Sequence, residues 1–234
     1  MPEPTPLPWP GRVPLLREAL LVAWGKGWLA PPAGVRRGEV GGLPLVGDGT
    51  DHTHRKMLSG SYEPSIAAAA RRLLQPGDLV VDVGAHIGWF TVLAAGLVGA
   101  RGRVLAFEPF PPSWALLERN VASLGQVTTE NVAVGAEAGV VRLGPQPGSD
   151  SGSVSAAAGS QADGIEVPVA TLDDLLDRAD VGGRPIRVLK VDVEGFEPQV
   201  LAGAQEALAR TEAVLYEVNR PALAALGSSE AQLH

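Results

Sequence analysis

The stretch VVDVGAHIGWFT, residues 80–91, constrains the fold more strongly than any other part of this sequence. A short β-branched run ends at a glycine, three residues follow, and a second glycine precedes another apolar run. This pattern predicts a buried strand that turns sharply into a helix. A glycine at the strand exit permits unusual backbone angles and lets a ligand approach the main chain. The first helical turn would also present free N–H groups, which favour an anion.

Strand patterns continue to alternate with helical patterns along the chain. This alternation predicts an α/β fold, with a mostly parallel sheet covered by helices on both faces. Ligands bind such sheets at the carboxyl ends of the strands. The expected strands are residues 79–84, 103–109, 127–135, 186–195 and 213–218. The expected helices are residues 65–74, 88–99, 112–125, 171–179, 199–210 and 221–227.

The first 60 residues are expected to form an appendage, followed by one domain over residues 61–234. The N-terminal residues are too rich in proline for a helix or a central strand. The segments expected in the appendage are a tail at 1–12, a helix at 14–29, a connector at 30–42 and a short edge strand at 43–49.

Composition and charge exclude several classes of protein. The chain has no cysteine, which excludes disulfides and cysteine-rich zinc sites. Its formal net charge of −7 makes nucleic acid a poor partner. Arg17, Glu18 and Lys26 interrupt the most apolar early stretch, so a membrane span of roughly 20 apolar residues is not available. We therefore expect a cytoplasmic protein without a membrane or nucleic-acid partner, and consider a homodimer as its candidate assembly.

Two polar segments have alternative interpretations. Asp51, His52 and His54 have the spacing of metal ligands, but no further ligand is obvious, so a polar loop without metal is the simpler interpretation. Residues 144–164 are rich in glycine, serine and alanine. They predict a solvated loop or a weak hairpin, with a lid over a site as the alternative.

A carboxylate at the end of the second predicted strand favours a nucleoside ligand. The glycine pattern is not the dinucleotide fingerprint G-x-G-x-x-G, because His86 stands at the position of the middle glycine. Glu108 follows that strand in AFEP, 20 residues after Gly88. A carboxylate there lies beside the glycine turn and can accept two hydrogen bonds from a ribose diol.

Taken together, these motifs resemble the class I S-adenosylmethionine-dependent methyltransferases of the FkbM type. The matching stretches are YEP at 62–64, PGDLVVDVGAHIGWFT at 76–91, GRVLAFEPFP at 102–111, NVAVG at 131–135, TLDDLL at 171–176, KVDVEGFEPQVLAGA at 190–204 and YEVN at 216–219. The resemblance implies a Rossmann-like sheet and methyl transfer from S-adenosyl-L-methionine. The implied acceptor is a hydroxyl of a small molecule, such as a sugar, a glycan or a secondary metabolite.

The resemblance also implies which residues hold the cofactor. Gly84, Ala85 and Gly88 would form the loop under its methionine part, and Glu108 would hold the ribose hydroxyls. Residues 131–133 would line the adenine pocket. The full implied set is Tyr62, Glu63, Asp82, Gly84, Ala85, His86, Gly88, Glu108, Pro109, Asn131, Val132 and Ala133.

The chain departs from the family pattern at two places. His86 stands where the family usually has asparagine, and an imidazole can replace the amide as a hydrogen-bond donor. The family also normally continues into two further strands, whereas this chain ends at His234. We therefore expect a sheet without its last two strands, which would leave the fifth strand as an exposed edge.

Three charged residues near the fourth predicted strand are the catalytic candidates. Lys190, Asp192 and Glu194 alternate, which places them on one side of a strand for as far as the strand conformation lasts. A buried lysine–carboxylate pair would satisfy them structurally. Under the resemblance, Asp192 or Glu194 would accept the hydroxyl proton, and Lys190 would orient one of them. His86 is a weaker candidate for this base.

Two other functions fit the same sequence. One is a nucleotide-cofactor oxidoreductase, which Glu108 suits but the missing middle glycine disfavours. The other is a non-catalytic module that binds a cofactor or a partner protein.

Overall fold

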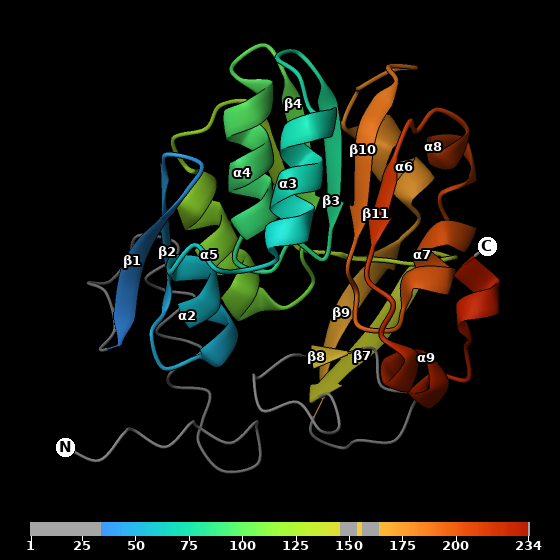
Figure 1. Cartoon of the computed structure of the whole chain (residues 1–234). Coiled ribbons are helices and arrows are strands. Elements are labelled where there is room, and N and C mark those ends of the chain that lie inside the picture. Colours follow the sequence, from blue (N-terminus) through green and yellow to red (C-terminus); the bar gives the residue numbers. More distant parts are fainter. Residues whose placement is uncertain (1–33, 146–153, 156–163, 234) are drawn as a thin grey trace.

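A parallel five-stranded sheet forms the centre of the molecule (Figure 1). The computed structural model describes residues 34–145, 154–155 and 164–233. The strand order is β11-β10-β3-β4-β5. The strands are β3 (Leu79–Val83), β4 (Arg103–Phe107), β5 (Val127–Glu130), β10 (Ile186–Val191) and β11 (Val214–Tyr216). The direction of strand order reverses between β3 and β10, where ligands bind in sheets of this kind.

Helices cover both faces of this sheet, as the alternating pattern predicted (Figure 1). One buried cluster joins Val80 of β3 to α3 (Pro64–Leu73), α4 (Trp89–Val98) and α5 (Pro111–Val121). A second cluster joins Val81 to α6 (Leu172–Arg178), α7 (Glu197–Ala202) and α8 (Gln205–Ala209). Neighbouring residues of β3 thus face opposite clusters, which is the two-residue period of a strand buried on both sides. The fold is the expected Rossmann-like α/β arrangement.

The N-terminal described residues form a hairpin and a helix beside α4 and α5 (Figure 1). Strands β1 (Val35–Val40) and β2 (Leu43–Asp48) pair antiparallel, and α2 (His52–Leu58) follows. The edge strand expected at 43–49 is confirmed. The connector expected at 30–42 is wrong for β1, because pairing with β2 makes those residues a strand.

The N-terminal elements share the core of the main sheet. Val40, Leu45 and Met57 belong to the same buried cluster as α4. A division at residue 60 therefore stays a prediction. The predicted tail at 1–12 and helix at 14–29 lie outside the described residues.

A second, smaller sheet was not predicted. Its order is β6-β9-β7-β8, and its strands are β6 (Ala133–Val134), β7 (Gly139–Pro145), β8 (Val154–Ser155) and β9 (Ile165–Ala170). The strand expected at 127–135 therefore divides, with β5 in the main sheet and β6 in the small one. Most of the expected loop at 144–164 lies outside the described residues, and so does its interpretation as a lid.

Two further expected elements differ from their predicted extent. The strand expected at 186–195 stops at Val191, because the chain turns at Glu194 (φ 53°) and Gly195 (φ 100°). The helix expected at 199–210 divides into α7 and α8 at Gly203. A Cβ at Gly203 would lie 2.0 Å from the carbonyl oxygen of Gly135, so this break lets two backbones approach closely.

The remaining expected helices are present within a few residues of their predicted ends, including α9 (Arg220–Ala225), which is followed by the 3₁₀ helix η1 (Glu230–Leu233). Among the described residues, no helix is long and apolar enough to cross a membrane.

Candidate active site

A cavity of about 320 Å³ opens at the carboxyl edge of the main sheet. This volume lies at the lower end of the range for small-molecule sites. The predicted site residues that line it are Tyr62, Glu63, Gly84, Ala85, His86, Glu108, Pro109, Val132, Ala133, Lys190, Asp192 and Glu194. The predicted residues outside the lining are Asp82, Gly88 and Asn131. The structure therefore brings most of the predicted residues to one cavity.

The two glycines of the first turn serve close packing. Gly84 has φ 79°, and a Cβ there would lie 1.9 Å from the carbonyl oxygen of Asp192. Gly84 thus lets the end of β10 approach the turn. Gly88 has φ 89°, and a Cβ there would lie 2.6 Å from the Leu117 side chain. Gly88 therefore allows α4 to begin against α5.

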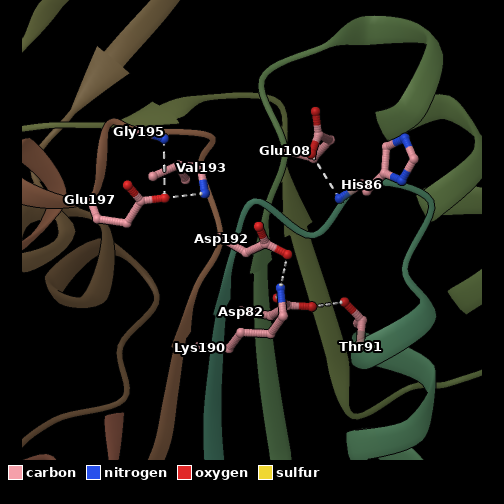
Figure 2. A network of polar contacts seen from close by, with 9 residues as sticks. All are labelled: Asp82, His86, Thr91, Glu108, Lys190, Asp192, Val193, Gly195 and Glu197. Atoms are coloured by element: carbon pink, nitrogen blue, oxygen red, sulfur yellow. Dashed lines mark hydrogen bonds and ion pairs between the residues drawn. The ribbon is translucent and has the colours of Figure 1, made fainter. Parts of the chain in front are cut away.

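Glu108 lies at the exit of β4 and binds the first turn. Its Oε2 accepts a hydrogen bond from the backbone N–H of His86 at 2.7 Å (Figure 2). Its Oε1 accepts one from the backbone N–H of Phe110 at 2.8 Å. Burial raises the pKa of Glu108 to about 7, against the lowering effect of these two bonds. Each carboxylate oxygen can still accept a second hydrogen bond from a ligand in the cavity.

Asn131 supports this carboxylate from outside the cavity. Its Nδ2 donates to the carbonyl oxygens of Glu108 at 2.8 Å and Pro109 at 2.9 Å. Val132 and Ala133, which follow it, line the cavity directly. Asn131 therefore fixes the backbone of the β4 exit, while its neighbours form part of the wall.

His86 is held by an interaction that the sequence did not reveal. It has φ 53°, a conformation in which histidine and asparagine are enriched among non-glycine residues. Its Nε2 lies 3.4 Å from Nε2 of His54, whose Nδ1 accepts the backbone N–H of Asp48 at 3.0 Å. Burial, followed by His54, lowers the pKa of His86 to about 3. The ring is therefore neutral near pH 7.

The polar loop expected at residues 51–54 is instead the start of α2. Asp51 caps this helix by accepting the backbone N–H of His54 at 2.8 Å. Within the described residues, no group of three or more potential ligands could hold a metal ion.

A buried ion network joins β3 to β10 (Figure 2), and its members Lys190 and Asp192 line the cavity. Lys190 Nζ lies 2.9 Å from Asp192 Oδ2 and 3.8 Å from Asp82 Oδ1. Thr91 donates to Asp82 at 2.6 Å. Burial lowers the pKa of Lys190, but the two carboxylates raise it more strongly, and the net shift is upward. Burial raises the pKa of Asp192, but the opposing effect of Lys190 is larger, so the net shift of this pKa is downward.

The alternating pattern allowed a buried pair between Lys190 and a neighbouring carboxylate, and in the structure Lys190 pairs with Asp192. Glu194 does not share a strand face with it, because β10 ends at Val191.

Glu194 lies in a second turn, which leads from β10 into α7. Its Oε2 accepts a hydrogen bond from Asn219 at 3.1 Å. Glu197 Oε1 accepts the backbone N–H groups of Val193 at 3.1 Å and Gly195 at 3.3 Å (Figure 2). Glu197 had no role in the sequence analysis, although it is the last carboxylate of the motif KVDVEGFE.

Glu217 is a second carboxylate that the sequence analysis did not single out. It follows β11 directly, lines the cavity and belongs to the matching stretch YEVN. Partial burial, followed by the charges of Asp192 and Glu194, raises its pKa to about 7. Its position after a strand beside Asp192 was the signal that could have identified it.

Tyr62 and Glu63 reach the cavity from the segment before α3. The Tyr62 ring packs edge-on against Trp89 with ring centroids 5.2 Å apart. Burial raises the pKa of Glu63. Its Oε2 is buried and has no hydrogen-bond partner within the described part of the chain. A buried, unpaired acceptor is costly, so this atom is suited to a ligand donor.

Comparison with known proteins agrees with this geometry. The Methyltransferase FkbM domain family matches residues 82–229. The chain is 33% identical over 166 residues to the 31-O-demethyl-FK506 methyltransferase FkbM of Streptomyces tacrolimicus, covering 57% of this chain and 62% of the relative. It is 28% identical over 143 residues to the hexuronic acid methyltransferase AglP of Haloferax volcanii, covering 61% of this chain and 56% of the relative.

The chain thus spans less than two thirds of the length of these two relatives. Among solved structures, a precorrin-6y C5,15-methyltransferase from Geobacter metallireducens matches with a TM-score of 0.43 at 15% identity, over 77% of this chain and 75% of that protein. The family match covers the glycine turn, Glu108 and both turns that carry the cavity carboxylates. This chain belongs to the FkbM methyltransferase domain family.

Proposed function

We propose that this protein is an S-adenosylmethionine-dependent methyltransferase that methylates a hydroxyl oxygen of a small molecule or a sugar. The observation that carries the proposal is the position of Glu108. It is buried at the exit of β4, bonded to the glycine turn and open to the cavity. The two relatives support the acceptor class, because one is named for 31-O-demethyl-FK506 and the other for a hexuronic acid.

The residues around the cavity fit this cofactor. Glu108 would accept the ribose hydroxyls. Gly84 and Ala85 would lie under the methionine part, whose ammonium group suits the unpaired Oε2 of Glu63. Val132 and Ala133 provide an apolar wall for adenine. Tyr62 and the adjoining segment would close over the bound cofactor.

When bound, S-adenosylmethionine supplies a methyl group that an acceptor oxygen can attack as the carbon–sulfur bond breaks and leaves its electron pair on sulfur. The chain itself has to align the acceptor and remove the hydroxyl proton. The carboxylates at the ends of β10 and β11 line the cavity, which supports them as candidates to accept this proton. Asp192 and Glu194 are the candidates expected from the sequence, and Lys190 holds Asp192 in place.

Calorimetric titration with S-adenosylmethionine and S-adenosylhomocysteine tests the cofactor assignment. The wild type should bind both with micromolar affinity, and Glu108→Ala should weaken binding by about 1–3 kcal/mol. Glu166→Gln changes an exposed carboxylate of β9 that pairs with Arg142, and it should bind like the wild type. If NADH displaces S-adenosylhomocysteine, the oxidoreductase alternative is favoured instead.

An acceptor screen then tests the reaction itself. The panel should contain a neutral sugar, a uronic acid and a hydroxylated macrolide, with tritiated methyl transfer as the readout. Cofactor binding without transfer to any acceptor would favour the non-catalytic binding module.

A further inference from the structure

The backbone register of the main sheet places Glu217 beside Asp192. Val191 pairs with Tyr216 in the parallel ladder between β10 and β11, so the residue after each strand lies next to the other. The backbone N–H of Glu217 donates to the Val191 carbonyl at 3.4 Å. Both side chains line the cavity.

These two neighbouring carboxylates have different surroundings. Asp192 is bound to Lys190 at 2.9 Å, and this ion pair keeps it charged. A buried ammonium group stabilises the charged form of a neighbouring carboxylate and lowers its pKa, so that carboxylate is a weak base. Glu217 has no ion pair with a cationic side chain of the described residues. It shares a side-chain hydrogen bond with Asp192, and the charges of Asp192 and Glu194 act on it.

Glu194 is less suited to accept a proton from the cavity. Its Oε2 is occupied by Asn219, which also caps α9 by accepting the backbone N–H of Ala222. The capping bond fixes the orientation of the Asn219 amide. Glu194 is therefore tied to the start of α9.

We propose that Glu217, rather than Asp192 or Glu194, accepts the proton of the acceptor hydroxyl. This inference rests on the proposed methyl transfer. As the acceptor oxygen bonds to the methyl carbon, its O–H bond breaks and leaves the electron pair on oxygen. The proton passes to the Glu217 carboxylate, which becomes a neutral carboxylic acid. Glu217 is only partly buried, so it can return the proton to solvent.

The surrounding charges suit Glu217 to this role. A general base is most effective when its pKa lies near the working pH, and the pKa of Glu217 is raised to about 7. Besides Asp192 and Glu194, the titratable groups that face it are Glu63 and Tyr62 from the segment before α3. Asp192 thus acts as a positioning residue, because its fixed charge makes its neighbour more basic.

Carboxyl titration by ¹³C NMR tests the inference without an acceptor. Glutamate-labelled wild type should show two carboxyls that titrate near pH 7, of which the Glu217 signal is absent from Glu217→Gln and the Glu108 signal is absent from Glu108→Gln. In Asp192→Asn the Glu217 carboxyl should titrate at lower pH, because the neighbouring charge is gone. Titration of Glu217 near its ordinary pKa in the wild type would overturn the proposal.

Kinetics with an acceptor from the screen provide the second readout. Glu217→Gln should lower kcat by about 100-fold or more, as expected when a general base is removed. Its affinity for S-adenosylhomocysteine should stay within about threefold of wild type, since the cofactor contacts remain. The wild-type rate should rise through pH 7 and then level off, and Asp192→Asn should shift this midpoint downward.

Two outcomes separate failure of this inference from failure of the proposed function. If Glu217→Gln retains the wild-type rate, or if Glu194→Gln alone abolishes it, the role of Glu217 is overturned while methyl transfer stands. If the wild type binds no S-adenosylhomocysteine, the proposed function fails, and the role of Glu217 fails with it. Glu166→Gln is the matched control and should leave rate, midpoint and affinity unchanged.

Discussion

Two turns at the carboxyl edge of the main sheet meet the same backbone requirement in different ways. The first turn, residues 84–88, leads from β3 into α4, and the second, residues 192–196, leads from β10 into α7. Each contains a non-glycine residue with φ 53°, His86 in the first and Glu194 in the second. In the first turn a buried carboxylate accepts one N–H group of the turn, and in the second a buried carboxylate accepts two.

The source of that carboxylate differs between the two turns. Glu108 comes from the neighbouring strand β4, whereas Glu197 comes from the helix that the second turn begins. Glu108 lines the cavity, and Glu197 does not. The first turn therefore depends on a distant residue that also lines the cavity, and the second is stabilised locally. Lys190 connects the two, through Asp82 below the first turn and Asp192 in the second.

Gly84→Ala should have the largest effect, because its methyl group would lie 1.9 Å from the Asp192 carbonyl oxygen. We expect a loss of more than about 4 kcal/mol of folding free energy, measured by urea unfolding. Gly60→Ala has a similar φ of 73° with open space around it and should lose about 1–2 kcal/mol. Gly195→Ala should fall between them. Equal losses for Gly84→Ala and Gly60→Ala would contradict the close approach of the two turns.

Lys190→Met should break the connection between the turns and leave two carboxylates without their counter-ion. Removing one partner of a buried ion pair costs about 3–5 kcal/mol. Adding Asp82→Asn should recover part of this loss, because it removes one of the buried charges. Thermal or urea unfolding measures both, and Lys56→Met, at an exposed lysine of α2, should change stability by less than about 0.5 kcal/mol. An unchanged unfolding midpoint for Lys190→Met would rule out this role.

Glu108→Ala and Glu197→Ala should separate ligand binding from local stability. Each leaves two backbone N–H groups without their acceptor, which costs about 1–3 kcal/mol of folding free energy. Only Glu108→Ala should weaken S-adenosylhomocysteine binding by about 1–3 kcal/mol, because it alone faces the cavity. Calorimetry and urea unfolding on the same samples measure both effects. Equal losses of affinity would show that the two carboxylates have the same role.

The smallest effect should appear in the pH dependence of stability. Burial raises the pKa of Glu108 from the ordinary 4.5 to about 7. Between these values the folded protein binds more protons than the unfolded chain, so the contribution of Glu108 to stability falls as pH rises from 4.5 to 7. Between pH 5 and pH 8, the free energy of unfolding should therefore decrease more for the wild type than for Glu108→Gln. S-adenosylhomocysteine affinity should change in the opposite sense, because the ionised carboxylate is the better acceptor.

Several features could be predicted because they depend on neighbours in the sequence. The strand, glycine turn and helix around Gly84 combine β-branched residues, turn residues and a long apolar run. The helix expected at 171–179 is present as α6, and Thr171 caps it by accepting the backbone N–H of Asp174 at 3.1 Å. The place of Glu108 followed from the rule that strand ends in a parallel sheet meet at one edge.

Other features escaped prediction because they depend on residues far apart in the chain. Strand β1 is preceded by a proline- and glycine-rich segment, and its conformation is decided by pairing with β2. Strands β7 and β9 stabilise one another in a small sheet, where Val140 remains 69% exposed. His54 contacts His86 from 32 residues away, and no local pattern predicts that contact.

The sequence by itself determined the strands of the main sheet and the helices between them, the glycine turn and the family, because each depends on short, contiguous patterns of apolar and turn residues. The tertiary structure alone decided which carboxylates are neutralised and which face a ligand. Asp192 and Glu217 look alike in the sequence, but only one of them binds Lys190. Their difference depends on strand register and burial, which set the local electrostatic environment and appear only when the sheet has formed.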